Sequence, residues 1–420
     1  MNTNLTNWAG NYRYSAAEIH APATVEQVQE LLAGSRKVKA LGTRHSFNDI
    51  ADCTGDLLSL AHLDRVVELD RERGQVRVEG GIRYGELCRF LHDAGYALHN
   101  MASLPHISVA GACATATHGS GNRNGNLATA VVAIEVVTAN GEITVFSRER
   151  NPEEFRGAVV GLGALGIVAR LTLDLSPAFE MRQDVYQNLS LARLEDCFEP
   201  IVSGAYSVSL FTDWQEARFN QVWFKRRVDD DPAFEPEDEI FGATRALGQL
   251  HPLAGMPAMN CTEQMGVPGP WHERLPHFRM EFTPSCGEEL QSEYVLPRTH
   301  AVKALHAVYE LRDHIAPLLQ ISEVRTVAAD EYWLSPYYHQ DCVCIHFTWR
   351  PDWPAVQAVL PLIERALAPF EARPHWGKLF TMPAEQLQPL YERLPEFRQL
   401  VHRHDPDGKF RNSYLDAYIL

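Results

Sequence analysis

The sequence lacks any apolar run that would cross a membrane, and it lacks a secretion signal. No window of the 420 residues approaches the roughly 18 continuous apolar residues that a membrane span needs. The first ten residues, MNTNLTNWAG, have neither the basic start nor the apolar stretch of a signal peptide. We therefore expect a cytoplasmic protein without a membrane partner.

Positive charge is also scarce. Lysine and arginine number 38 against 54 aspartates and glutamates, for a net charge of -16, and the densest basic cluster is KRR at 225–227. An acidic surface repels nucleic acid and anionic membranes, so no nucleic-acid partner is expected. Hydrophobic residues at 45% and charged residues at 22% are typical of a globular protein, and the length is typical of two domains.

Cysteines are few and scattered. Of the eight, the only close pair is Cys342 and Cys344, and no second Cys/His pair stands at the spacing of a zinc finger or ribbon. We expect free thiols and no metal site.

The apolar pattern predicts an α+β protein in three segments. Residues 1–178 and 371–420 form one domain, and residues 179–370 form a second domain inserted between them. A helix over 83–95 should place Leu87, Phe90 and Leu91 on its apolar side. The other expected elements are helices over 20–33, 299–319 and 353–370, and strands over 65–70, 75–81, 167–175, 206–214, 220–227, 278–282 and 342–350.

The segment GLGALG, from Gly161 to Gly166, matches the G-x-G-x-x-G fingerprint of dinucleotide-binding loops. That motif needs a strand before it and a helix after it, so that the pyrophosphate meets a helix N-terminus. Here we expect a helix before and a strand after, which excludes a Rossmann site. The glycines either let the backbone approach a ligand closely or form a turn.

A run of small residues extends from Ser103 to Gly125 without helical periodicity. Its backbone N–H groups and hydroxyls are accessible, as a diphosphate site built from a nest of backbone donors requires. A closely packed turn beneath a sheet is the alternative interpretation. The small residues that favour the diphosphate site are Ser108, Gly111, Thr115, Thr117, Gly119 and Gly121.

Two polar pairs stand on expected strands. Glu323 and Arg325 are two residues apart, as are His346 and Thr348, so each pair projects from one face of its strand. Either pair alone is consistent with a solvated face. Together they favour the lining of a polar pocket, whereas Lys378 by itself is consistent with an ordinary surface lysine.

These motifs carry a family resemblance. GTRHS (42–46) followed by SLPHISVAGACATATHGSG (103–121) resembles the vanillyl-alcohol-oxidase-type covalent flavoproteins, and within them the alditol (xylitol/sorbitol) oxidases. The GTRHS loop is also found in sugar-lactone oxidases, but its combination with the two polar pairs and Lys378 is more specific. The resemblance implies a two-subdomain FAD-binding domain and an α+β substrate (cap) domain with an antiparallel sheet.

The resemblance also implies the cofactor and its contacts. His45 would be joined covalently to the 8α-methyl group of FAD. The other residues expected to contact FAD are Leu41, Gly42, Thr43, Arg44, Ser46, Ser103, Ser108, Gly111, Thr115, Thr117, His118, Ile167 and His375.

The implied reaction oxidises the terminal C1 hydroxyl of xylitol or sorbitol to the aldose. Hydride passes to flavin N5, and O2 becomes H2O2. His346 is the expected base, with Lys378 as the alternative, and Arg325 and Lys378 orient hydroxyls and favour developing negative charge. The expected substrate-binding residues are Ser103, Glu323, Arg325, Thr348 and Lys378.

Three other functions stay open at this point. A sugar-1,4-lactone oxidase has the same His-flavin loop and differs in the pocket. A flavin dehydrogenase would pass electrons to an acceptor other than O2, and a flavin-carrying binding protein would have no turnover. The expected partners are a small polyol and O2, and we expect a monomer.

Overall fold

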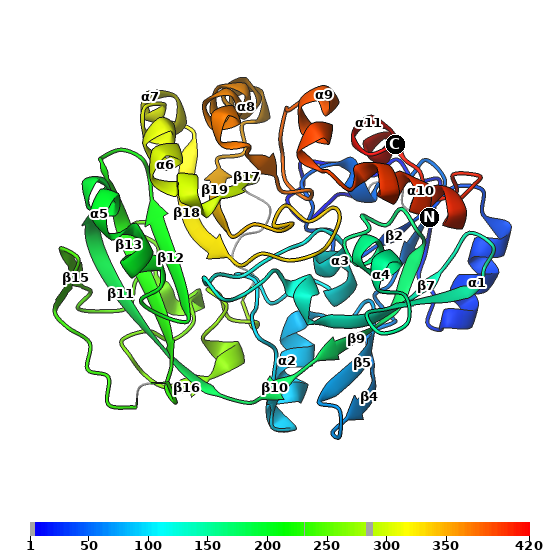
Figure 1. Cartoon of the computed structure of the whole chain (residues 1–420), viewed down its shortest axis with the longest axis horizontal. Coiled ribbons are helices and arrows are strands. Elements are labelled where there is room, and N and C mark those ends of the chain that lie inside the picture. The colour runs from blue at the N-terminus through cyan, green and yellow to red at the C-terminus, as the bar shows by residue number, and fades with distance from the viewer. Residues whose placement is uncertain (1–4, 231, 283–288) are drawn as a thin grey trace.

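The computed structural model describes residues 5–230, 232–282 and 289–420. Two large antiparallel sheets occupy the two halves of the molecule, and a small parallel sheet lies at the N-terminal end (Figure 1). The predicted α+β class is confirmed. Among the described residues, no helix has the length and apolar content needed to cross a membrane.

The first half contains a five-stranded and a three-stranded sheet. The five strands all pair antiparallel, and in sheet order they are β4 (Val66–Asp70), β5 (Gln75–Glu79), β9 (Ile167–Asp174), β7 (Val131–Val137) and β8 (Ile143–Ser147). The three parallel strands are β1 (Glu18–His20), β3 (Asp56–Ser59) and β2 (Val38–Leu41). The helices of this half are α1 (Val25–Gly34), α2 (Tyr84–Asp93), α3 (Val109–Ala114) and α4 (Pro152–Ala158). A two-stranded pair, β6 (Tyr96–Ala97) and β10 (Ser176–Pro177), closes it.

The second half is built on a ten-stranded sheet. Its path is β14 (Glu239–Ile240), β15 (Ala243–Arg245), β11 (Glu180–Ser190), β13 (Arg218–Arg227), β12 (Ser207–Thr212), β18 (Leu319–Val327), β19 (Cys342–Trp349), β17 (Leu290–Pro297) and β20 (Arg373–Pro374), with β16 (Gly269–Pro270) paired to β11. Helices α5 (Leu194–Val202), α6 (Ala301–Tyr309), α7 (Arg312–Ile315) and α8 (Trp353–Leu367) complete this half.

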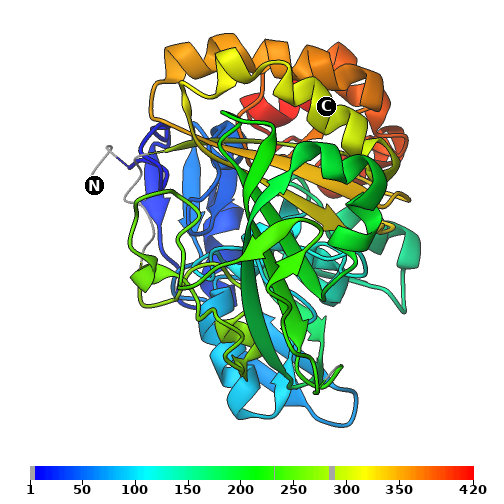
Figure 2. The same cartoon turned by 90° about the vertical axis from the view of Figure 1, so that its left-hand side faces the viewer.

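Alternation along the strands of the ten-stranded sheet gives it one apolar and one polar face. Val324 and Ile345 point to the helices and are fully buried in a cluster with Leu305 of α6 and Leu360 of α8. Figure 2 shows these helices lying along one side of the sheet. The helices therefore cover the apolar face, and the residues between the apolar ones face the interior of the molecule.

The last segment of the chain contacts both halves. Strand β20 joins the edge of the ten-stranded sheet, whereas α10 (Leu394–His404) packs on α4 and α11 (Ser413–Tyr418) shares a core cluster with the five-stranded sheet. The short helix α9 (Ala384–Leu387) lies between them in sequence. The division into three segments and its boundaries stay a prediction, and within 371–420 strand β20 pairs with the sheet of the second half.

Several sequence expectations differ from the structure. Phe90 is 41% exposed, while Leu87 and Leu91 are fully buried, because Phe90 lies about 100° around the helix from Leu91. Residues 278–282 form no strand: Phe278 makes one isolated bridge with Cys261. The helix expected over 299–319 divides into α6 and α7, since the backbone leaves the α conformation at Leu311 (φ -92°, ψ 6°). The seven described cysteines are free thiols.

Gly166 is at a position where a side chain is excluded. Its φ of +144° is unfavourable for an L residue, and an added Cβ would lie 2.4 Å from the backbone oxygen of Val137. We expect Gly166→Ala to lower the free energy of unfolding by about 1–3 kcal/mol. Urea denaturation measures this loss. The control is Gly248→Ala, where a Cβ meets nothing within 4 Å; equal losses in both variants would contradict the assignment.

Candidate active site

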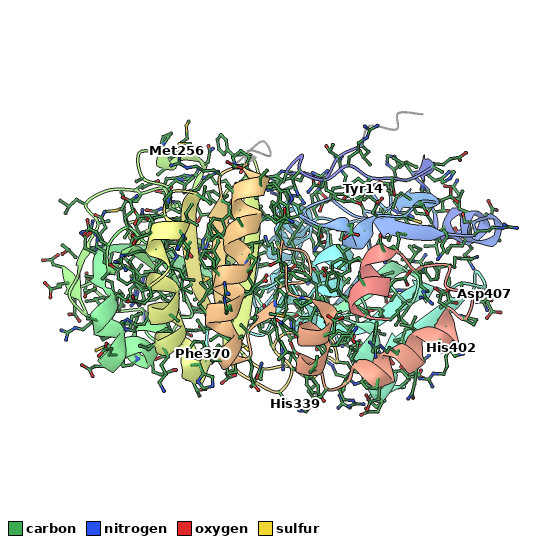
Figure 3. All side chains as sticks on the ribbon, turned by 90° about the horizontal axis from the view of Figure 1, so that it is seen from above. Tyr14, Met256, His339, Phe370, His402 and Asp407 are labelled. Carbon is green, nitrogen blue, oxygen red and sulfur yellow. The ribbon has the colours of Figure 1, made fainter. Side chains whose placement is uncertain are left out.

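One cavity of about 710 Å³ extends between the two halves of the molecule. Its size is within the range of cofactor and substrate pockets. The cavity is lined by the 41–47 loop, the small-residue run, the 161–166 segment and the polar face of the large sheet. Tyr14 and Met256, two further lining residues, lie on the same edge of the molecule, one over each half (Figure 3).

The loop after β2 is held against the small-residue run. Thr43 Oγ1 accepts a hydrogen bond from the Ser108 backbone N–H at 3.2 Å and contacts His45 Nδ1 at 3.0 Å. Gly42 lies so near Ser108 that an added Cβ would be 2.6 Å from its hydroxyl oxygen. Arg44 has a φ of +64°, which turns the chain sharply and directs His45 into the cavity. Leu41 and Ser46 line the same cavity.

The His45 ring is partly buried and rigidly held. Its ring stacks on Trp8, with centroids 5.3 Å apart and planes 25° apart. The backbone after His45 is anchored by the Asn7 side chain, which donates to Ser46 O at 2.9 Å, and by Phe47 N–H, which donates to Gly377 O at 2.8 Å. Burial, with His106 and the Lys378 cation nearby, lowers the pKa of His45 to about 3. The imidazole is therefore neutral near pH 7 and keeps the lone pair that bonding to carbon requires.

The small-residue run contains a short helix, contrary to the expectation of no helix. Helix α3 spans six residues, and Ser108 precedes it. Gly111, Thr115, Thr117 and His118 line the cavity, and a Cβ on Gly111 would be 2.9 Å from Ser108 Oγ. The backbone therefore borders the cavity directly, which favours the interpretation of the run as a ligand site over a turn beneath a sheet.

The GLGALG segment lies between α4 and β9, so the expected helix-before, strand-after order is confirmed. Its glycines line the cavity. The buried Lys39 ammonium donates to the carbonyl oxygens of Leu162 and Gly163, each at 3.1 Å, and fixes the turn. Ile167, an expected cofactor contact, has its side chain in an apolar cluster, while its neighbours Gly166 and Val168 line the cavity.

The polar pairs meet on one face of the large sheet. The register places Glu323 of β18 opposite His346 of β19, and His346 opposite Glu293 of β17. Residues directly opposite one another project from the same face. Two residues further along β19, Thr348 lies opposite Gln291 of β17. The residues that share this face and line the cavity are Glu323, His346, Glu293, Thr348 and Gln291.

Arg325 connects these groups. Its guanidinium lies 3.1 Å from Glu293 Oε1, 3.5 Å from Glu323 Oε1 and 3.3 Å from the Ser103 hydroxyl. His118 Nε2 lies 2.9 Å from the same Glu293 oxygen. Burial by itself raises the pKa of each carboxyl. Arg325 and a histidine beside each, His118 for Glu293 and His277 for Glu323, outweigh it and hold both pKa values below the usual range, so both groups are ionised.

His346 and Lys378 share one partner. The side-chain oxygen of Gln291 accepts from the Lys378 ammonium and contacts His346 Nε2 at 3.1 Å. An amide oxygen can only accept, so His346 carries its proton on Nε2 and has a lone pair on Nδ1. Burial and the Lys378 and Arg325 cations outweigh the effect of Glu293 and lower the pKa of His346 to about 3.

Lys378 itself is a half-buried cation. Burial lowers its pKa to about 8, and its ammonium lies 4.9 Å from the centroid of the Phe47 ring. His375, an expected cofactor contact, lines the cavity; its backbone N–H donates to Glu293 O at 3.0 Å and its Nδ1 accepts from Gly377 N at 3.1 Å.

The structure adds residues that the sequence reading missed: Trp8, Gln291, Glu293, His277 and Lys225. Gln291 and Glu293 show the same two-residue spacing on a strand as the two pairs that were found, so the same rule applied to LQSEYVLP would have identified them. Trp8 and Lys225 carry no local signal, because their contacts depend on tertiary structure.

Comparison with known proteins agrees with this geometry. A family model described as FAD binding domain matches residues 16–147, and one described as D-arabinono-1,4-lactone oxidase matches residues 283–418. An alditol oxidase of Streptomyces sp. (strain IKD472 / FERM P-14339) is 53% identical over 419 residues, which cover 99% of each chain. The chain belongs to the alditol oxidase family.

One further relative and one solved structure are more distant from this alditol oxidase family member. An L-gulono-1,4-lactone dehydrogenase of Mycobacterium tuberculosis is 29% identical over 430 residues, 97% of each chain. The crystal structure of cholesterol oxidase from B. sterolicum superposes with a TM-score of 0.78 at 14% identity and covers 100% of this chain and 97% of the other. That match shows a shared fold.

Removing the Arg325 cation tests the buried charge network. We expect Arg325→Met to lower the free energy of unfolding by about 3–5 kcal/mol at pH 7, because two buried carboxylates lose their counter-charge. The pKa values of Glu293 and Glu323 are lower in the folded protein than the value of about 4.3 in the unfolded chain. The stabilisation by Arg325 is therefore present above about pH 4.3 and is lost as the pH falls through the folded pKa values. The difference in the free energy of unfolding between Arg325→Met and the unaltered protein should therefore become smaller below about pH 4.

Urea denaturation at pH 7 and at low pH measures both effects. The control is Arg350→Met, at an exposed arginine, where we expect a change within about 0.5 kcal/mol. A deficit that is small at pH 7, or that widens on acidification, would contradict the network.

Proposed function

We propose that this protein is an FAD-dependent oxidase that converts the terminal C1 hydroxyl of polyols such as xylitol and sorbitol to the aldose. One observation carries the proposal: the His45 loop and a face of charged and hydroxyl-bearing side chains border the same cavity. The alditol oxidase relationship over 99% of the chain supports the substrate class. We further propose a cytoplasmic monomer, as expected from the sequence.

The residues around the cavity fit a dinucleotide cofactor. Gly42 and Gly111 keep the backbone uncovered where a Cβ would collide with Ser108. Thr115 and Thr117 present hydroxyls 3.1 Å apart at the end of α3. These groups would hold the diphosphate of FAD, and Ser103, Ser108 and His118 would contact the rest of the cofactor. The matching FAD binding domain model covers all of them.

His45 is the proposed covalent attachment point, through the 8α-methyl group of the flavin. Three features of the structure support it: the ring is neutral, it is immobilised by Trp8 and Thr43, and it borders the cavity. A permanent bond would keep the cofactor in place through every turnover.

The polar sheet face would recognise the polyol. Glu323 accepts hydrogen bonds, Arg325 and Lys378 donate them, and Ser103 and Thr348 do both. Such a set matches a chain of hydroxyl groups, each of which needs a donor and an acceptor. A substrate lacking one hydroxyl would leave a buried group unpaired, which costs affinity.

When bound, FAD would supply the acceptor for the hydride from C1, and O2 would be the final electron acceptor, giving H2O2. The chain's part is to accept the hydroxyl proton, and His346 Nδ1 is the proposed acceptor because Gln291 engages the other ring nitrogen and the side chain lines the cavity. Arg325 and Lys378 would favour negative charge as it develops on the substrate oxygen.

A sugar-1,4-lactone oxidase is the second candidate. The D-arabinono-1,4-lactone oxidase model matches residues 283–418, which contain four of the five proposed substrate-binding residues, Glu323, Arg325, Thr348 and Lys378. The lower identity of the lactone-acting relative, 29% against 53%, favours the polyol. A dehydrogenase with an acceptor other than O2 is the third.

Substrate and oxidant are tested together. Purified protein is supplied with xylitol, sorbitol or an aldono-1,4-lactone, and peroxide formation is measured beside dye reduction. We expect peroxide with both polyols and at least about tenfold lower kcat/KM with lactones, a difference that unpaired pocket groups account for. Lactone preference would favour the second candidate, and activity with dyes but not O2 would favour the third.

The covalent bond is tested by Ala substitution of His45. Acid precipitation of the unaltered protein should leave the yellow chromophore in the pellet, whereas His45→Ala should release it into the supernatant. His106→Ala, at a half-buried histidine nearby, is the matched control and should retain the chromophore. Release from the unaltered protein, or retention by His45→Ala, would refute the attachment.

The proton acceptor is tested by His346→Ala. We expect kcat to fall by at least about tenfold, since a positioned base contributes about 10²–10⁴-fold, with the flavin spectrum unchanged. Lys378→Met provides the comparison. Lys378 loses its proton above its pKa of about 8, so the activity of the unaltered protein should decline above pH 8, and the activity of Lys378→Met should not. Near-normal turnover by His346→Ala would transfer the role to Lys378.

A further inference from the structure

A buried chain of side chains lies behind Glu323. The Lys225 ammonium on β13 contacts His277 Nδ1 at 3.1 Å, and His277 Nε2 contacts Glu323 Oε1 at 2.7 Å. Lys225, His277 and Glu323 are 1%, 5% and 6% exposed. His277 and Glu323 line the cavity, whereas Lys225 lies behind them.

The donors of Lys225 determine the proton position on His277. Burial lowers the pKa of Lys225 to about 7, and below that pH the group is an ammonium with three donors and no acceptor. Two donate to the carbonyl oxygens of Leu275 and Pro276, at 2.7 and 2.9 Å, and the third points at His277 Nδ1. The ammonium form of Lys225 favours a lone pair on Nδ1, and the ionised Glu323 carboxylate can only accept at Nε2, so the ring proton is on Nε2.

Packing holds the His277 ring in this orientation. Phe211 and Trp223 contact it edge to face, with centroids 5.4 and 5.2 Å away. Burial and the adjacent Lys225 cation outweigh Glu323 and lower the pKa of His277 to about 4. The ring is thus a neutral donor near pH 7, and it cannot rotate without losing both of its polar contacts.

The His277 backbone reaches a second pocket residue. Its N–H donates to Ser103 O at 3.2 Å, and the Ser103 hydroxyl accepts from Arg325. One residue therefore links the two parts of the polar pocket that come from opposite halves of the molecule, the Ser103 loop and strand β18.

We propose that Lys225 and His277 are positioning residues for polyol binding: Lys225 fixes the tautomer of His277, and His277 fixes the orientation of the Glu323 carboxylate. The inference rests on the proposed function. Within the described residues, the contacts of Glu323 from His277 and from Arg325 both use Oε1, which leaves the other carboxylate oxygen for a substrate hydroxyl. A carboxylate free to rotate would lose this alignment.

The first experiment measures substrate affinity and chemistry separately. Flavin bleaching by xylitol is followed anaerobically by rapid mixing, which gives a Kd and a limiting reduction rate. We expect His277→Phe to raise Kd by about tenfold or more, since one buried hydrogen bond to a charged group is lost. His277→Gln retains a donor at a similar reach and should recover to within about threefold. His402→Phe, at an exposed histidine, is the control.

Combined variants show whether each residue acts through the next. His277→Phe should add no further loss in a Glu323→Ala background, and Lys225→Met should add none in a His277→Phe background. Independent, multiplicative losses in these pairs would overturn the proposal. So would an unchanged Kd in His277→Phe, or no recovery in His277→Gln.

A readout without turnover separates this inference from the proposed function. Nitrogen NMR of histidine-labelled protein, with the His277 signals assigned by their absence in His277→Gln, should show a protonated Nε2 and an unprotonated Nδ1. Lys225→Met should shift this tautomer balance. If xylitol fails to bleach the unaltered protein, the proposed function fails, and the NMR result still decides the tautomer; a protonated Nδ1 would contradict the positioning chain.

Discussion

The buried ion cluster around Arg325 is the constraint on which the rest of the site depends. One guanidinium lies between Glu293 and Glu323, each on a different strand, and reaches the Ser103 loop as well. An unpaired charge at this depth would be strongly unfavourable, so the sheet register and the loop position must satisfy all these contacts together. A rigid polar surface inside an acidic protein is the result.

The same cations keep the surrounding histidines neutral. Burial first, and then Lys378 together with Arg325, lowers the pKa of His346 and His375 to about 3. A neutral imidazole is what the proposed proton acceptor requires. The two carboxylates, by contrast, remain ionised beside the same arginine. The site thus holds acceptors, donors and fixed charge within one cavity, as recognition and deprotonation of a polyhydroxy substrate demand.

Much of this was predictable from local spacing. Strand period placed Glu323 with Arg325 and His346 with Thr348 correctly, and the 161–166 segment was correctly separated from a Rossmann loop. The register that brings Glu293 opposite His346 is a tertiary property with no local signature. The exposure of Phe90 and the irregular backbone of 278–282 could not be predicted from the apolar pattern. Both depend on which parts of the fold pack against these residues.

The most direct test is a crystal structure of the anaerobically reduced protein soaked with xylitol. The account predicts a polyol on the polar face of the large sheet, with hydroxyl groups on Glu323 and Arg325 and its terminal carbon beside His346. A polyol that binds elsewhere, or a pocket whose carboxylates turn away from it, would contradict the account.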